Sequence, residues 1–164
     1  MSPKEIFHDD VIVSYSQIMI YDRSIQLPGC EWTEAHSNQG FARRKGTLCC
    51  GTLIEYGKGD ATVYMGNLDD LEKYERVIET PFYSKTGEVE MAAPDEYPVT
   101  RRFQICSGNY SLIVAQRYVD EEMVKIDLYF KGVETPLEKS SILLRDDALN
   151  PRDLLIEDAE VPGN

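Results

Sequence analysis

The chain has 164 residues, of which 29 are Asp or Glu and 17 are Lys or Arg, so its net charge is -12. This charge argues against direct binding to nucleic acid or to anionic lipid, and it raises the rate of encounter with a cationic protein. The length suits one domain around a single core, and no segment approaches the ~20 consecutive apolar residues that a membrane helix requires.

The N-terminal segment precedes a long apolar stretch. Residues 1–8 have no apolar core and no small-residue cleavage site, so nothing marks the chain for export and we expect it in the cytoplasm. His8 lies in this segment, which we expect to be a flexible arm. Residues 11–21 are rich in β-branched and aromatic side chains and predict one long strand, although their alternation is imperfect.

A short helix is predicted between Thr33 and Gly40. Thr33 has the side chain of an N-cap, and Gly40 is typical of the residue that ends a helix. Glu34 and His36 are two positions apart and lie on different helix faces. We therefore expect His36 to be a surface residue.

Glycine marks the next predicted turn. Residues 47–56 and 61–65 predict two strands, and residues 57–60 predict the hairpin turn that joins them. The two glycines of this turn would suggest a phosphate loop only if a helix followed, and here a strand follows.

Further strands are predicted after residue 75. Residues 76–83 predict a strand with Pro81 at an edge or a bulge, and residues 88–92 predict a short strand. The remaining predicted elements are a hairpin of residues 99–106 and 110–118 with its turn at 107–109, and a strand at 124–130.

Together these segments predict a mainly β fold. Seven to eight short strands without crossover helices favour an antiparallel β-sandwich of two sheets with one short helix. We assign residues 1–134 to this sandwich domain. Residues 135–164 form an acidic C-terminal extension of the same domain, which either docks its leucines on the sandwich or stays mobile.

The four cysteines have no metal-ligand spacing. Cys49 and Cys50 are adjacent and would point to opposite faces of a strand, so they cannot both reach one metal ion. We expect free, partly buried thiols, and a single distant disulfide remains open. Neither histidine lies beside an evident nucleophile. We therefore expect no catalytic residue, no metal ligand, no cofactor and no enzymatic activity.

Charged residues are clustered. The acidic connection consists of Asp69, Asp70 and Glu72, and the acidic turn consists of Asp120, Glu121 and Glu122. Either cluster could be a calcium loop or an ordinary solvated connection, although neither has the spacing of a known calcium loop. A calcium- or carbohydrate-binding β-sandwich module is therefore the alternative function. The basic residues at 43–45 and 101–102 either balance acid across a sheet or recognise an anion.

Two groups of segments carry a resemblance to a known family. Residues 31–34 read Glu-Trp-Thr-Glu and are followed at 39–42 by Gln-Gly-Phe-Ala. Further along the chain come Val77, Pro81 with Phe82, Gly87, Arg102 with Phe103, and the residues at 108–112. In their order and spacing, which extend over roughly residues 10 to 118, these segments resemble the competence protein J family, bacterial inhibitors of the DNA-entry nuclease.

The resemblance implies a protein that is not an enzyme and that binds and inhibits a bacterial DNA nuclease, either in competence or as the immunity protein of a nuclease toxin. A nuclease cleft is basic because it holds phosphates, and carboxylates fit a phosphate or metal site. We favour a core position for the tryptophan. The sequence leaves the oligomeric state open. The predicted partner-binding residues are Glu31, Trp32, Glu34, Phe41, Asp69, Asp70, Glu72, Asp120, Glu121 and Glu122.

Overall fold

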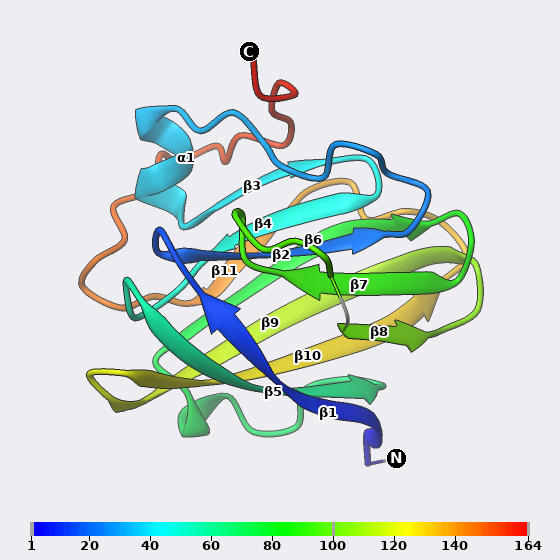
Figure 1. The fold of residues 1–164 in the computed structure, drawn as a ribbon, viewed down its shortest axis with the longest axis horizontal. Coiled ribbons are helices and arrows are strands. Elements are labelled where there is room, and N and C mark those ends of the chain that lie inside the picture. Colours follow the sequence, from blue (N-terminus) through cyan, green and yellow to red (C-terminus); the bar gives the residue numbers. More distant parts are fainter. Residues whose placement is uncertain (1, 100, 164) are drawn as a thin grey trace.

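Two β-sheets pack face to face in the computed structural model, which describes residues 2–99 and 101–163 (Figure 1). The six-stranded sheet has the order β1 (Lys4–Val13), β5 (Gly57–Met65), β10 (Met123–Val133), β9 (Gly108–Asp120), β6 (Arg76–Ser84) and β11 (Ser141–Leu144). The five-stranded sheet has the order β3 (Phe41–Arg44), β4 (Thr47–Gly51), β2 (Gln17–Asp22), β7 (Glu88–Ala92) and β8 (Arg101–Gln104). The helical elements are α1 (Glu34–Gln39) and the 3₁₀ turn η1 (Leu71–Lys73).

The predicted mainly β sandwich is confirmed, with more strands than expected. The described residues contain eleven strands instead of seven or eight. Neighbouring strands pair antiparallel except β5 and β10, which run parallel. Thr100 belongs to the strand predicted at residues 99–106 and lies outside the described residues.

The predicted single strand over residues 11–21 is wrong, because the chain turns within it. β1 belongs to the six-stranded sheet and β2 to the five-stranded sheet. Between them Tyr15 and Ser16 have φ angles of 54° and 59°, and the N–H of Gln17 donates to the carbonyl of Ser14 at 3.1 Å. This is the geometry of a two-residue hairpin turn in which both central residues are left-handed. The imperfect alternation marks the turn.

The predicted hairpin turn at residues 57–60 is also wrong, because these residues are the beginning of β5. Here glycine permits close packing. A Cβ on Gly57 would lie 2.3 Å from the carbonyl oxygen of Glu122. A Cβ on Gly59 would lie 2.8 Å from side-chain carbons of both Val11 and Ile126 on the neighbouring strands. Both positions therefore exclude a side chain.

The predicted hairpin of residues 99–118 divides between the two sheets. β8 pairs with β7, whereas β9 pairs with β6 and β10. The turn residues thus carry the chain from one sheet to the other. The expected edge at Pro81 is confirmed. Pro81 pairs with Ser111 of β9 on one side, and on the other side the pairing with β11 stops at Glu79, so that side of Pro81 has no neighbouring strand among the described residues.

The ends of α1 are those predicted from sequence. The hydroxyl of Thr33 accepts from the N–H of His36, and Gly40 ends the helix with a φ of 84°. His36 is only 3% exposed, so the prediction that it lies on the surface is wrong. Its Nδ1 accepts from the N–H of Thr33 at 3.0 Å, and its Nε2 donates to the carbonyl of Asp158 at 3.0 Å. The ring is therefore a structural link to the C-terminal extension.

The core lies between the sheets. The ring of Phe130 meets those of Phe82, Phe103 and Tyr110 edge-on, at centroid distances of 5.6, 5.6 and 5.7 Å. Cys49 and Cys50 point to opposite sides of β4, and all four cysteines are free. Among the described residues, no helix has the length and hydropathy needed to cross a membrane.

The C-terminal extension packs on the sandwich. After β11, Leu149 is buried at 4% exposure, whereas Leu154 is 80% exposed. The side chain of Gln39 donates to the carbonyl of Ile156 at 2.9 Å and accepts from its N–H at 2.8 Å. The extension therefore lies across α1, as its position in Figure 1 shows.

Asp22 links the two sheets at the end of β2. Its carboxylate, 1% exposed, accepts from the hydroxyl of Ser84 in β6 at 2.6 Å and from both the N–H and the hydroxyl of Thr86. Burial raises the pKa of Asp22, but these bonds and those from Ser24 outweigh burial and lower it to about 2.

We predict that Asp22 stabilises the fold in a pH-dependent way. Its folded pKa lies below the unfolded value of about 3.9, so its contribution is complete above that pH and is lost as the pH falls towards 2. Asp22→Asn should cost ~2 kcal/mol at pH 6 and should flatten the decline between pH 4 and 2. Urea unfolding at several pH values measures both, with the exposed Asp9→Asn as control. Equal pH dependence in the Asp22→Asn variant and the wild type would contradict this.

Candidate functional site

Connections from both sheets meet at the end of the sandwich on the left of Figure 1, which we call the turn end. It comprises the β1–β2 turn at Tyr15 and Ser16, the β4–β5 connection at residues 52–56, and the acidic turn between β9 and β10. The start of β6 also lies here, because Arg76 pairs with Gln116 of β9.

The β1–β2 turn is held rigidly. The N–H of Ser16 donates to the carbonyl of Glu55 at 2.9 Å, and the carbonyl of Ser16 accepts from the N–H of Thr52 at 2.9 Å. A left-handed φ is uncommon for a bulky residue such as Tyr15 and costs about 1–3 kcal/mol. The bonds to the β4–β5 connection maintain this conformation.

Two exposed tyrosines form a pair at this end. The rings of Tyr15 and Tyr56 lie 5.6 Å apart at an interplanar angle of 65°, and the residues are 59% and 53% exposed. Neither residue was among the predicted partner-binding residues. The available signals were the change of alternation around Tyr15 and an aromatic residue directly before Gly57.

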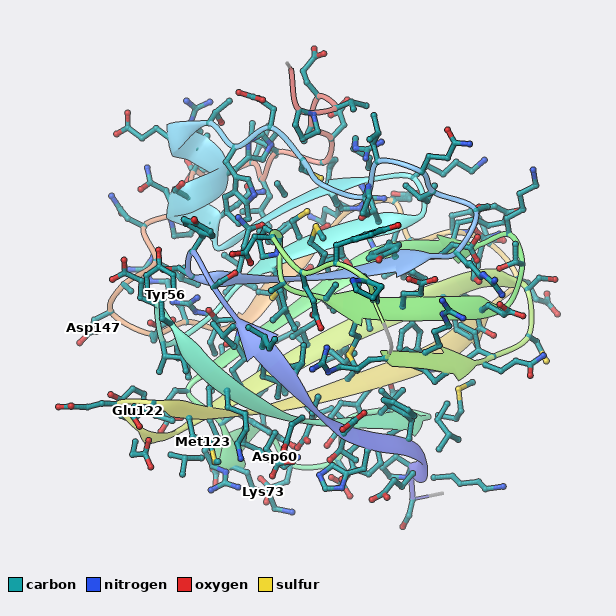
Figure 2. The ribbon with its side chains drawn as sticks, in the orientation of Figure 1. Tyr56, Asp60, Lys73, Glu122, Met123 and Asp147 are labelled. Atoms are coloured by element: carbon teal, nitrogen blue, oxygen red, sulfur yellow. The ribbon has the colours of Figure 1, made fainter. Side chains whose placement is uncertain are left out.

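The acidic turn is attached through the backbone to the two residues that follow Tyr56. The N–H of Lys58 donates to the carbonyl of Glu122 at 2.9 Å, and Gly57 packs directly against the same carbonyl. Figure 2 shows Tyr56, Glu122 and Asp147 at this one end of the molecule. The carboxylate of Asp120 stabilises the turn by accepting from the N–H of Glu122 at 2.8 Å.

The acidic connection leads into β6, which starts at this end of the six-stranded sheet. Asp70 caps η1 by accepting from the N–H of Glu72 at 3.1 Å. Glu75 lies directly before β6. Its carboxylate accepts from the N–H of Tyr118 at 2.7 Å, and its backbone N–H donates to the carbonyl of Gln116 at 2.9 Å. Glu75, which follows the acidic connection, is therefore bonded to the strand that leads into the acidic turn.

The carboxylates of these two clusters are not neutralised by neighbouring cations of the described residues. Within the described residues, none of Asp69, Asp70, Glu72, Asp120, Glu121 and Glu122 forms an ion pair. All six are exposed except Asp70, which is half-buried. Their negative charge is available to a partner.

Carboxylates on the neighbouring sheet face are neutralised internally. The Nζ of Lys125 lies 2.8 Å from Asp127 and 3.9 Å from Asp60, which also contacts His8 at 2.5 Å. Burial raises the pKa of Asp60, but His8 and Lys125 outweigh it and hold this pKa below its usual value. His8 lies in β1, so the predicted flexible arm is wrong.

The clustered basic residues also pair with acids. Arg102 lies 3.3 Å from Glu90 across β7 and β8, and Arg101 pairs with Glu96. Arg43 lies 3.5 Å from Glu157 of the extension. Of the two alternatives, balance of local acid is confirmed for these three arginines.

The other predicted partner-binding residues lie away from the acidic clusters. Glu31 and the exposed Glu34 flank the start of α1, and the N–H of Glu31 donates to Glu160 of the extension at 2.8 Å. Phe41 is completely buried between the sheets, so it presents no surface to a partner and we withdraw it from the site.

Trp32 occupies an intermediate position. It is half-buried against the apolar cluster of Met19, Cys30 and Cys49. Together with Tyr15 it also lines a hollow of about 410 Å³. Its indole Nε1 is buried without an acceptor in the described part of the chain. The preference for a core position therefore holds only in part.

A buried ion pair forms one wall of this hollow. Arg76, 5% exposed, donates from Nε and Nη2 to the two carboxylate oxygens of Asp146 at 2.7 and 3.0 Å. Burial raises the pKa of Asp146, but the guanidinium outweighs it and keeps this pKa below its usual range. Among the described residues, no three His, Cys, Asp or Glu side chains are placed to hold a metal ion.

Comparisons with known proteins place this geometry in context. The sequence model of the competence protein J (ComJ) family matches residues 10–131. One similar solved structure is ComJ of Bacillus subtilis, an inhibitor of the DNA-degrading activity of NucA, with a TM-score of 0.69 and 16% identity over 81% of this chain and all of that chain. Another is the product of crocagin biosynthetic gene J, with a TM-score of 0.50 and 12% identity over 79% of this chain and 98% of that chain. Searching the curated proteins gave no match. At these identities the structures show a shared fold.

We predict that Trp32→Ala lowers the free energy of unfolding by ~2 kcal/mol, because a half-buried tryptophan loses less than the 3–5 kcal/mol typical of a core position. Thermal or urea unfolding measures the change. Leu27→Ala, in the same loop and 64% exposed, is the control and should leave the melt unchanged. A loss of more than ~4 kcal/mol would restore the core assignment, and an unchanged melt would assign Trp32 to the surface.

Proposed function

The chain belongs to the competence protein J family, and on this premise we propose that it inhibits a bacterial DNA nuclease by direct binding. The related ComJ of Bacillus subtilis inhibits the DNA-degrading activity of NucA. That similarity supports the class of partner. The turn end of the present chain supports the way in which the partner is bound.

One observation carries the proposed mechanism. The six carboxylates of the acidic connection and the acidic turn form no ion pair among the described residues, and all but Asp70 are exposed. An enzyme that cleaves DNA must hold phosphates in a basic cleft, often with a divalent metal. The acidic connection and the acidic turn fit such a cleft in place of the phosphates. Bound there, they block entry of DNA.

The net charge of -12 adds a second, kinetic contribution. A field of this sign steers the protein towards a cationic cleft and accelerates association by roughly 10- to 1000-fold at low salt. Steering acts at the range of the Debye length, about 8 Å at physiological salt. Contact at the turn end then determines how long the complex lasts.

We further propose that the protein catalyses no reaction itself. His36 is committed to capping α1 and holding the extension, and His8 to Asp60. Cys30, Cys49 and Cys50 are buried, and burial raises the pKa of the Cys50 thiol to about 12. We expect no DNA hydrolysis by the purified protein with or without added Mg²⁺. Turnover that a single substitution abolishes would contradict this.

The same binding would serve competence control or immunity to a nuclease toxin. The two uses differ in the target, which is a DNA-entry nuclease in one case and a secreted toxin in the other. A nuclease gene beside the gene for this protein, followed by an inhibition assay with that nuclease, distinguishes them.

We predict that neutralising either acidic cluster slows inhibition. The variants are Asp69→Asn/Asp70→Asn/Glu72→Gln and Asp120→Asn/Glu121→Gln/Glu122→Gln, in which asparagine retains the caps. The probe is the DNA nuclease that immobilised wild-type protein retains from its own bacterium. Each triple variant should reduce the association rate about tenfold at low salt and flatten its salt dependence.

The matched control removes the same charge at three exposed positions outside both clusters. Glu5→Gln/Glu134→Gln/Glu138→Gln changes three exposed carboxylates, two of which follow β10 and one of which lies in β1 opposite Tyr64. This control should change the association rate less than twofold. If all three variants behave alike, or if DNA does not compete with the protein for the nuclease, the phosphate-site mechanism fails.

A further inference from the structure

We propose that the Tyr15–Tyr56 pair is the anchor of the complex and stacks in the part of the nuclease cleft that holds DNA bases. This inference rests on the proposed function and deepens it, since it names the chemistry of the surface that the turn end contacts. The nuclease partner would combine cationic phosphate sites with a flat apolar, aromatic or guanidinium slot between them.

The first support is the exposure and arrangement of the rings. More than half of each residue is accessible, although each ring is held edge-on against the other. Tyrosine is enriched among interface residues that dominate binding, because it buries a large rigid surface at low entropic cost. Bases in a nucleic-acid cleft stack on aromatic or guanidinium faces, and a phenol ring can take the same place.

The second support is preorganisation. Tyr15 sits in a left-handed conformation that glycine or asparagine would adopt more easily, and the chain keeps tyrosine there. The turn is bonded to Glu55 and Thr52, and Ile54, which lies between these two residues, is buried in the core. Both rings are therefore presented before binding, and little freedom is lost when a partner covers them.

The third support is the charge around the pair. Glu122 is attached to the strand that begins directly after Tyr56. On the other side, the hydroxyl of Ser14 donates to Asp95 at 2.7 Å. Partial desolvation, Tyr15 and the negative charges of Glu55 and Asp95 together raise the pKa of Tyr56. Aromatic rings beside carboxylates offer a partner the same two kinds of group as the bases and phosphates of a single strand. This complementarity commits the pair to a nuclease cleft.

The hollow beside the pair extends the contact. Tyr15 forms part of its rim, and Trp32 and Gly40 line other parts of it. A partner that covers the pair can therefore also place a side chain in this space. Tyr97, by contrast, is 93% exposed and has no aromatic partner among the described residues, so it provides a matched control.

The test uses Tyr15→Gly and Tyr56→Ala in the full chain, with the retained nuclease as the probe. Glycine accepts the left-handed turn, so Tyr15→Gly should fold with an unchanged or higher melting temperature. We expect each variant to raise the dissociation rate about 30-fold or more, with an association rate and salt dependence close to the wild type. Tyr97→Ala should leave all three quantities unchanged. A short oligothymidylate should compete with the wild type for the nuclease.

The outcomes separate the anchor from the proposed function. If the wild type inhibits the nuclease and the tyrosine variants dissociate at the wild-type rate, the anchor is wrong and the inhibitor assignment stands. Simultaneous binding of the oligonucleotide and the protein to the nuclease would also overturn the anchor. A wild-type dimer that Tyr15→Gly dissociates would make the pair a contact between two copies and overturn it as well. If the wild type inhibits no nuclease, both proposals fail.

Discussion

The whole arrangement depends on a two-residue turn that moves the chain from one sheet to the other. With φ angles of 54° and 59°, Tyr15 and Ser16 end β1 in the six-stranded sheet and start β2 in the five-stranded sheet. The turn also changes which side of the strand is apolar, so that Val13 before it and Ile18 after it reach the same core. Its bonds to residues 52–56 place Gly57, and with it the acidic turn, at the same end.

The parts of the fold that could be predicted are those fixed by nearby residues. The caps of α1 depend on Thr33 and Gly40, which lie within one short segment, and both were identified from sequence. Strand pairing depends on residues far apart in the chain. Gly59 was predicted to lie in a turn because glycine is common in turns. It lies in a strand, where the side chains of Val11 and Ile126 on the two neighbouring strands leave no room for a Cβ. Likewise, the turn residues at 107–109 predict a change of direction but do not indicate which of the two sheets the next strand joins.

The same limit applies to the site. Both acidic clusters were identified from the sequence. Their lack of ion pairs could not be predicted, because the cations pair with acids far away in the chain, such as Arg76 with Asp146 and Lys125 with Asp60. These contacts decide which carboxylates are neutralised and which remain available. Phe41 was predicted to contact a partner but is buried. Tyr15 was predicted to lie within a strand but is exposed in a turn. The exposure of Tyr15 depends on the position of the β1–β2 turn, which was not predicted.

The strand contributed by the C-terminal extension has a consequence for how copies of the protein meet. β11 lies outside the segment that matches the family, and it occupies the edge of β6 at Val77, Ile78 and Glu79. An open strand edge is a template for pairing with another chain. Beyond β11, the edge continues to Pro81, which has no N–H to offer a neighbour. The extension and the proline thus blunt this side of the sheet against edge-to-edge aggregation, so that copies of the protein are not expected to pair through β6.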